Sequence, residues 1–567
     1  MTVSTHVYTA QIVGGATLRV KGGEVSLDAS RAPHVDGTVT IALPSLAVLA
    51  ALDPRLSPAA RIKIDVAASF PWGTQSRSFN LTLRDRTINH ATGRVELLVS
   101  SDEGILSDYA PLTDDLAPLG YQASLRGLVG YVLNKVIPGA VLAAGTDVAV
   151  PALADSSNLI RNPRAGVNTT DWYGTYTSGG LTINRIGSNG PSYAPTYVAY
   201  LSNSGVFTNN AEMFITDAAV SITAGKKHVL SVSVSAINGR QLILDAMCLD
   251  ASGNITGFIP PVNFTGNATW QRVATEWFVP YPNTVRIRPR IRAAQLGGSE
   301  YVNVTGWRLC EVTGDPAADA AYFDGDTADT AQYDYSWAQT AHASISNRKR
   351  LTDAATPDGL TWKAGQSALA FLGPIVEAAG RRLVCDENRV WTLRETTYSA
   401  PGTLAIRHGV NLTDGSEKIS RRDEDWFDAA VVVYRWTDRN GIQQERTDSY
   451  ALTASYTRLR RFEITTAYPG PGFAQYVVKR AQGRGREVTV STVSDWAAAA
   501  EQEVQIVLDG APTQTGQTIS VAFDFDRDEM TITSRTIDTP PGAWILLAAG
   551  QKWTDSPVGA SWTGEAV

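Results

Sequence analysis

Two stretches with helical periodicity constrain this chain most, because they are similar in character and lie far apart. The first, SLRGLVGYVLNKVI from Ser124, carries one apolar stripe made of Leu125, Leu128, Val129, Val132, Leu133 and Val136. The second, from Lys363 to Ala379, leads into the strand pair RRLVCD and RVWTLRE, and its apolar residues are Leu369, Phe371, Leu372, Ile375 and Val376. We infer that both belong to one parent domain, into which the residues between them are inserted.

The segments around and between these helices have the pattern of β-strands. Up to about residue 105, runs such as GTVTIAL and RIKIDVAASF alternate apolar and polar residues between turn residues. From about 155 to 345, strands of five to ten residues follow one another with almost no helical signal, which is typical of a jelly-roll sandwich. After Pro401 the strands return. The pattern predicts a mainly β, multidomain protein.

A length of 567 residues corresponds to about four domains of roughly 150 residues each. We expect a small β-barrel or sandwich at the N-terminus, small α+β elements and an inserted jelly-roll β-sandwich. The predicted parts are an N-terminal β-barrel at 1–110, a helical part of an α+β domain at 111–154, the inserted sandwich at 155–345, the remainder of the α+β domain at 346–400 and C-terminal β-domains at 401–567.

Charge and cysteine content exclude several classes of protein. The net charge of -7 argues against a surface that neutralises duplex phosphates, so no sequence-specific nucleic acid is expected as a partner. The three cysteines, Cys248, Cys310 and Cys385, are widely separated and form no CxxC or Cys/His pair. This spacing favours neither a disulfide framework nor a structural zinc site.

No catalytic motif is present. The sequence contains no HExxH, GxSxG or GxxxxGK[ST] pattern, and its six histidines stand apart from one another. A glycosidase needs two carboxylates across a cleft, and their spacing in space is not readable from one sequence. We therefore predict that the chain is not an enzyme, and glycan cleavage remains an alternative.

The segment AAYFDGDTADTAQYDYSWAQTAHAS, from Ala320 to Ser344, combines acidic and aromatic residues. Asp324, Asp326 and Asp329 lack the Gly and Glu that a regular calcium loop requires, so they are candidates only for an irregular calcium site. The structural interpretation is that the aspartates form side-chain-to-backbone turns while aromatic rings are buried at a domain junction. These clasp residues are Tyr322, Phe323, Tyr333, Tyr335 and Trp337. No other cofactor is expected.

Aromatic residues early in the insert could form a carbohydrate-binding platform, because exposed rings stack on pyranose C–H groups. The candidate residues are Trp172, Tyr173, Tyr176, Tyr193 and Tyr197. Trp270, Trp277 and Trp307 alternate with apolar residues on strands and are interpreted as core.

One basic cluster lies near GRGREV, at the end of a predicted helix. It consists of Lys479, Arg480, Arg484 and Arg486. Cations in a last helical turn complement the helix dipole, which is the structural interpretation. The functional alternative is a positive lining for a channel that carries DNA.

Several stretches resemble minor tail proteins of long-tailed phages of actinobacteria, in particular the tail-hub or baseplate-hub type. They are Phe79 to Pro111, Trp362 to Glu395, Lys418 to Trp436 and the phrase YFDGDTADTAQYDYSW. The stretch NLIRNPRAG…DWYG, in addition, resembles the opening of carbohydrate-binding-module jelly rolls. Together the similar stretches touch all the main regions of the chain.

The resemblance implies a homotrimeric hub at the distal tail tip of the virion, assembled in the host cytoplasm. Two tube-like β-domains per subunit would form a pseudo-sixfold ring that closes the tail tube. The implied partners are further copies of the chain, the distal tail protein, the tape measure protein and other tail-tip proteins. The insert would project outward and could bind host cell-wall polysaccharide, and the aspartate- and tyrosine-rich phrase would return the chain from insert to hub.

Three classes of function therefore remain open at this point. The first is a structural hub, the second a glycan-binding receptor-recognition protein, and the third a tail enzyme that cleaves glycans. Some hub proteins carry lysozyme or peptidase motifs, and this sequence shows none.

Overall fold

The computed structural model describes residues 4–175, 181–202, 211–214, 219–293, 296–420, 426–481, 486–511 and 513–536. The chain divides into two compact units. Unit 1 consists of Met1–Val150, Thr361–Arg435 and Glu445–Val567, and unit 2 of Pro151–Leu360 and Trp436–Gln444. The predicted insert at 155–345 lies inside unit 2, while both segments with helical periodicity lie in unit 1.

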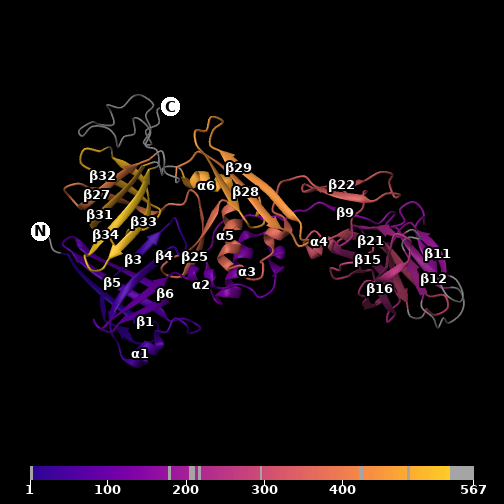
Figure 1. The fold of residues 1–567 in the computed structure, drawn as a ribbon, viewed down its shortest axis with the longest axis horizontal. Helices are drawn as coiled ribbons and strands as arrows, with labels where there is room; N and C mark the ends of the chain where they lie inside the picture. The colour runs from indigo at the N-terminus through magenta and orange to yellow at the C-terminus, as the bar shows by residue number, and fades with distance from the viewer. Residues whose placement is uncertain are drawn as a thin grey trace. The chain divides into compact units, whose positions relative to one another are not determined.

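Unit 1 is built around a sheet of 13 strands that come from both ends of the chain (Figure 1). The strands are β1 (Thr5–Ile12), β2 (Thr17–Leu18), β3 (Val20–Asp28), β4 (Val35–Ala42), β5 (Arg61–Phe70), β6 (Gly73–Asn89), β7 (Arg94–Ser100), β26 (Ala400–Arg407), β27 (Leu412–Ile419), β31 (Arg486–Val493), β32 (Gln502–Val507), β33 (Gln514–Asp524) and β34 (Glu529–Thr536). The N-terminal and C-terminal strands meet where β3 pairs antiparallel with β33. The main path runs β2-β1-β5-β6-β7-β4-β3-β33-β34-β31-β27.

Both halves of this sheet contribute to one hydrophobic core. In β5, buried Ile62 and Ile64 alternate with less buried polar residues, as the period of two in a strand requires. Such inward residues from the N-terminal strands share a core with Val504 and Phe523 of the C-terminal strands. The indole of Trp496 stacks on the Phe523 ring with centroids 4.5 Å apart. The two ends of the chain therefore fold as one body.

The mainly β fold class is confirmed, and the sheet that contains the N-terminal strands is not a closed barrel. Among the described strands, the main sheet begins at β2 and ends at β27, and no hydrogen-bonded pairing joins these two. One edge of β3 pairs with β33, so the N-terminal strands continue into the C-terminal strands.

The predicted α+β part of unit 1 forms around two capped helices, α3 (Leu125–Val136) and α5 (Ala368–Ala378). The Ser124 hydroxyl accepts a hydrogen bond from Gly127 N at the start of α3. Helix α5 starts five residues later than predicted, because the Ser367 hydroxyl accepts from Ala370 N and sets the helix N-terminus there. The three-stranded sheet beside them consists of β8 (Val141–Leu142), β24 (Arg381–Cys385) and β25 (Val390–Glu395).

The remaining helices are short, and β28, β29 and β30 form a further three-stranded sheet. The helices are α1 (Leu46–Ala51), α2 (Glu103–Asp108), α4 (Pro316–Ala320) and α6 (Phe473–Ala481), with 3-10 turns η1 (Ala117–Tyr121) and η2 (Pro357–Leu360). The sheet consists of β28 (Ala429–Thr437), β29 (Gln443–Ala451) and β30 (Leu459–Ile464). Within unit 1, α5 packs against α2, α3 and α6. No helix in the described ranges combines the length and the apolar character needed to cross a membrane.

Unit 2 is a sandwich of a seven-stranded and a five-stranded sheet (Figure 1). The seven strands are β10 (Tyr173–Thr175), β13 (Ala211–Phe214), β14 (Val220–Ser221), β16 (Gln241–Leu249), β17 (Ile255–Phe258), β18 (Val262–Thr265) and β20 (Arg286–Ala293). The five strands are β11 (Leu181–Ile186), β12 (Tyr197–Ser202), β15 (His228–Ala236), β19 (Gln271–Ala274) and β21 (Tyr301–Glu311). Their inner faces share one core, to which Leu244 of β16 and Val232 of β15 belong.

A small third sheet in unit 2 brings together the segments by which the chain enters and leaves the sandwich. It consists of β9 (Ser156–Asn158), β22 (Tyr333–Trp337) and β23 (Ser346–Arg350), in the order β22-β23-β9. A parallel bridge between Ala152 and Ala355 follows beyond it.

Candidate functional site

The segment that leaves the sandwich covers the outer face of the five-stranded sheet. In β15 the core residues alternate with Ser231 and Ser233, so these two hydroxyls lie on the outer face. The Arg272 guanidinium donates to Ser231 Oγ at 2.6 Å and to Ala320 O at 3.0 Å. Arg308 likewise donates to Ala318 O and Ala321 O, and to Ser156 Oγ at 2.8 Å. Two arginines on the sheet thus hold the returning backbone by its carbonyl groups.

The aromatic residues of the predicted clasp follow directly and are held by cations. Phe323 is 2% exposed, with the Arg308 guanidinium carbon 4.6 Å and that of Arg348 5.5 Å from its ring centroid. Tyr333 lies 4.6 Å from the same Arg348 carbon, and Tyr335 packs 5.6 Å from Phe323. These rings join the strands on either side of the insertion points.

Trp337 and Tyr322 complete the set of clasp residues at its two ends. A Cβ added at Gly325 would lie 2.3 Å from Cγ of Trp337, so only glycine allows this close approach of the indole. Tyr322 donates from its hydroxyl to Asp324 Oδ2 at 2.7 Å. Buried Asn158 of β9 donates to the carbonyls of Trp307 and Phe323, at 2.9 and 3.2 Å.

The three aspartates proposed as an irregular calcium site are each held by protein groups. Asp324 pairs with Arg164 at 2.8 Å. Asp326 accepts from Trp337 Nε1 at 2.9 Å and lies 3.1 Å from His342 Nε2. Asp329 accepts from the backbone N–H of Tyr335 at 2.9 Å. Within the described ranges, no group of three or more His, Cys, Asp or Glu side chains is arranged to hold a metal ion.

The candidate carbohydrate-binding residues do not form one platform. Trp172 is 6% exposed and its Nε1 donates to Asn162 O at 2.9 Å, so the indole belongs to the core and its predicted role as an exposed stacking face does not fit. Tyr173, 47% exposed, is on β10 of the seven-stranded sheet. Tyr197 lies on β12 of the other sheet, 5.2 Å from the ring of Trp270.

Tyr193 and Tyr176 complete the set. Tyr193 is 46% exposed, and its hydroxyl lies 2.9 Å from Ser233 Oγ on the face that the returning segment covers. Tyr176 lies outside the described residues. Of the five candidates, only Tyr173 is placed on the seven-stranded sheet with an exposed ring.

Sequence reasoning missed a row of arginines on the outer face of that sheet. In β20, Ile287 and Ile291 face the core, so Arg286, Arg288, Arg290 and Arg292 face outward. Arg290 donates to Asp245 Oδ1 of β16 at 2.5 Å, and Arg292 donates to Oδ2 at 2.7 Å. The signal was present in the sequence, because RIRPRIRA places an arginine at every second residue.

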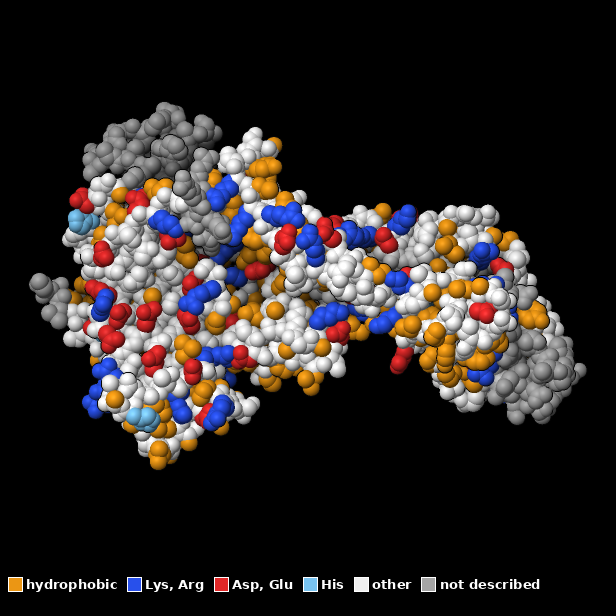
Figure 2. Space-filling model, in the orientation of Figure 1, with side chains coloured by type: hydrophobic (Ala, Val, Ile, Leu, Met, Phe, Trp, Pro, Cys, Tyr) orange, Lys and Arg blue, Asp and Glu red, His pale blue; other side chains and the backbone are white. Residues whose placement is uncertain are grey.

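The predicted basic cluster is divided among different partners. Arg480 pairs with Glu501 at 3.1 Å and Arg486 with Glu417 at 2.5 Å. Lys479 is exposed, and Arg484 lies outside the described residues. On the face drawn in Figure 2, Lys and Arg side chains of unit 1 lie among Asp and Glu side chains.

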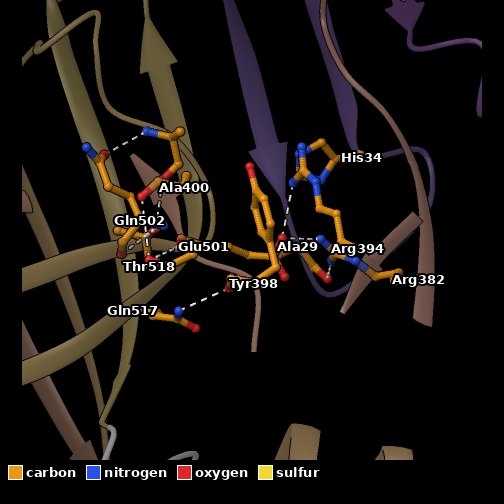
Figure 3. A network of polar contacts seen from close by, with 12 residues as sticks. Ala29, His34, Arg382, Arg394, Tyr398, Ala400, Glu501, Gln502, Gln517 and Thr518 are labelled. Carbon is orange, nitrogen blue, oxygen red and sulfur yellow. Dashed lines mark hydrogen bonds and ion pairs between the residues drawn. The ribbon is translucent and has the colours of Figure 1, made fainter. Parts of the chain in front are cut away.

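A network of polar contacts surrounds Glu501, which is 3% exposed (Figure 3). Arg480 belongs to this network. The Glu501 carboxylate accepts from Arg382 at 2.5 Å and from Arg394 and Arg480 at 3.1 Å each. Arg382 and Arg480 also donate to the carbonyl of Ala29, just after β3. Burial favours the neutral carboxyl, but the three guanidinium groups outweigh it and hold the pKa of Glu501 below its usual value.

His34 lies at the edge of this network, also buried, and its Nδ1 donates to Asp28 O at 2.9 Å. Burial, helped by the charges of Arg382 and Arg394, lowers the pKa of His34 to about 4. Because the unfolded chain binds this proton more readily, stability is complete above pH 6.5 and declines as the pH falls toward 4.

We expect His34→Gln to make unfolding less sensitive to acid. The His34 shift alone removes about 2 kcal/mol of stability between pH 8 and pH 5, and this loss should disappear in the variant. Urea unfolding at several pH values measures it. His90→Gln, at an exposed position, is the control and should keep the original pH slope. An unchanged slope in His34→Gln would contradict the assignment.

Comparisons with known proteins give distant structural matches only. No family model and no curated protein matches the sequence. The tail protein from Neisseria meningitidis MC58 aligns over 94% of this chain and 96% of its own, with 6% identity and a TM-score of 0.37. The 43 kDa tail protein of prophage MuSo2 from Shewanella oneidensis aligns over 94% and 98%, with 9% identity and a TM-score of 0.35.

Two partial matches cover about a quarter of the chain. TmCBM61, solved in complex with β-1,4-galactotriose, aligns over 27% of this chain and 99% of its own, with 15% identity and a TM-score of 0.22. The match to tailspike protein 4 of Bacteriophage CBA120 covers 27% of this chain and only 21% of the tailspike, with 14% identity and a TM-score of 0.23. Both structures that align over 94% of this chain are named tail proteins. Structural similarity this distant carries no argument about function.

Proposed function

We propose that this chain is a structural component of a phage virion, a hub at the distal tip of the tail. The observation that carries the proposal is the construction of unit 1, in which strands from both ends of the chain share one sheet and one core around an inserted sandwich. This is the organisation implied by the resemblance to tail-hub proteins. In this proposal, unit 1 serves assembly of the tail and unit 2 contacts the host.

A hub role requires association with other copies, and β27 supports it. This strand lies at one end of the main sheet and pairs, among the described strands, with β31 alone. Every residue of β27 except Leu412 is exposed. A strand at the end of a sheet is a common place for a neighbouring chain to add a strand of its own. The proposed assembly is a homotrimer that contacts the distal tail protein, the tape measure protein and other tail-tip proteins.

Light scattering on the purified chain tests this assembly. The expected mass is that of three chains of 60.8 kDa each, either alone or after addition of the distal tail and tape measure proteins. A mass of one chain under both conditions would contradict the hub. An electron-microscopy map of the virion tip would then locate the chain and its symmetry directly.

A second proposed role, glycan binding by the insert, is favoured by exposed rings on the outer face of the seven-stranded sheet. Tyr173 is 47% and Phe258 45% exposed there. Catalysis at this face is not proposed, because a glycosidase needs two available carboxyl groups. Asp245 is 2% exposed and is held by Arg290 and Arg292. The insert would therefore bind host surface polysaccharide rather than cleave it.

A further inference from the structure

The outer face of the seven-stranded sheet carries a row of arginines. Along β20, every second residue from Arg286 to Arg292 is an arginine on this face. Successive arginines are about 7 Å apart along an extended strand. In the pairing register, Asp245 of β16 stands opposite Arg290. This row of cations lies in a chain whose net charge is -7.

The contacts of Asp245 fix part of the row. Both carboxylate oxygens are used, one by Arg290 and the other by Arg290 and Arg292. Arg290 is 6% exposed and serves to fix the row, whereas the Arg292 side chain is 21% exposed and, held by Asp245, loses little further freedom when a ligand arrives. Arg286 is oriented separately, by donating to the carbonyls of Asp250 and Ala251 at 3.2 and 3.0 Å.

Exposed aromatic rings flank the row on both sides. Tyr173 of β10 is in register with Phe214 of β13, which is in register with Arg290. On the other side, Phe258 of β17 pairs with Met247 of β16, and the Arg290 guanidinium lies 4.9 Å from its ring centroid. Four strand spacings separate β10 from β17, which is about 19 Å. The face thus combines flat apolar rings at its edges with planar cations between them.

On the other outer face of the sandwich, the segment from Ala318 to Tyr322 accepts hydrogen bonds from Arg272 of β19 and Arg308 of β21. We propose that the seven-stranded face binds an anionic polysaccharide, whose carboxylates pair with the β20 arginines while its sugar rings stack on Tyr173 and Phe258. This inference rests on the proposed glycan-binding role and names its ligand class. Guanidinium forks match carboxylates in shape, and such charge-assisted hydrogen bonds are roughly twice as strong as neutral ones.

Binding of the full chain to polygalacturonate tests the inference, with neutral dextran and inorganic polyphosphate as comparison polymers. We expect the chain to bind polygalacturonate, more weakly as salt is raised, and not to bind dextran. Arg286→Gln/Arg288→Gln should weaken this binding about a hundredfold or more, since each lost contact to a charged group contributes about tenfold or more. Arg286→Glu/Arg288→Glu should abolish it.

The matched control is Arg435→Glu/Arg461→Glu, which makes the same charge change at two exposed positions of unit 1. Its binding should stay within twofold of the unaltered chain, and an equal loss would mean that the effect is only one of net charge. Unfolding midpoints of all variants show whether the sandwich remains folded. If the glutamate variant does not fold, the glutamine variant decides.

The possible outcomes separate the inference from the role on which it rests. Equal binding to dextran, or unchanged binding in the folded arginine variants, overturns the anionic ligand and leaves glycan binding in place. Binding to polyphosphate without polygalacturonate overturns the assignment to carboxylates. Failure to bind any of these polymers or isolated host cell wall removes the glycan-binding role as well, while the hub proposal is judged by its trimer alone.

Discussion

Replacing Glu501 by Gln is expected to destabilise unit 1 by about 3–5 kcal/mol, because it removes a buried carboxylate that pairs with three arginines whose side chains are 11–14% exposed. Gln has nearly the same shape as Glu, so the backbone at this position, where φ is +65°, is strained equally in both. The loss of unfolding free energy therefore measures the effect of removing the negative charge. Urea unfolding at pH 7 measures it, and hydrogen exchange in β24 and β32 locates it.

Glu417→Gln is the matched control, since it removes the same charge from the pair with Arg486. That pair lies at the edge strand β27 with side chains 18% and 23% exposed, and its loss should cost no more than about 1 kcal/mol. If both variants lose the same small amount, the Glu501 network does not hold unit 1 together. If Glu501→Gln instead raises exchange only within β32, the arginines have other sufficient partners.

The size of the expected effect follows from what the network connects. Arg382 and Arg394 come from the β24–β25 hairpin, Arg480 from α6, and the shared carbonyl of Ala29 from the end of β3. Glu501 itself immediately precedes β32. Segments that are far apart in sequence therefore supply the arginines that neutralise one carboxylate, that of Glu501. Such a junction would keep the two halves of the main sheet from separating.

Local sequence patterns were sufficient to predict the helices and hairpins whose stabilising contacts lie close together in sequence. The stripe from Leu125 to Val136 became α3 because its spacing and its Ser124 cap are encoded within 13 residues. The strand pair after α5 was predicted for the same reason. The pairing of β3 with β33 could not be predicted, because the partner strand lies about 500 residues later in the sequence and nothing in GEVSLDA identifies it.

The candidate sites were harder to predict because they depend on which face a residue occupies. Trp172 is of the residue type that stacks on sugar rings, but its indole enters the core and donates to Asn162 O. Arg480 was read with its sequence neighbours as one basic cluster, whereas its partner is Glu501. The arginine row of β20 could have been found from its alternation alone, since an arginine at every second strand position places all of them on one side.

Phe323→Ala is expected to destabilise unit 2 by about 3–5 kcal/mol, as for other buried phenylalanines. The ring fills the space between the guanidinium groups of Arg308 and Arg348, so its removal leaves a cavity and also ends two cation–π contacts. Thermal and urea unfolding measure the loss. The control is Tyr301→Ala, at a residue that is 47% exposed, and it should change stability by only about 0.5 kcal/mol.

Hydrogen exchange then separates a clasp from an ordinary packing defect. Arg308 also donates to Ser156 at the start of β9, and Asn158 of β9 donates to the Phe323 carbonyl. Since β9 pairs with β23 and β23 with β22, losing the ring should raise exchange in all three strands together. Faster exchange in β22 alone would mean that the returning segment only rests on the sandwich. Joint loosening would mean that one phenylalanine secures both points at which the insert joins the chain.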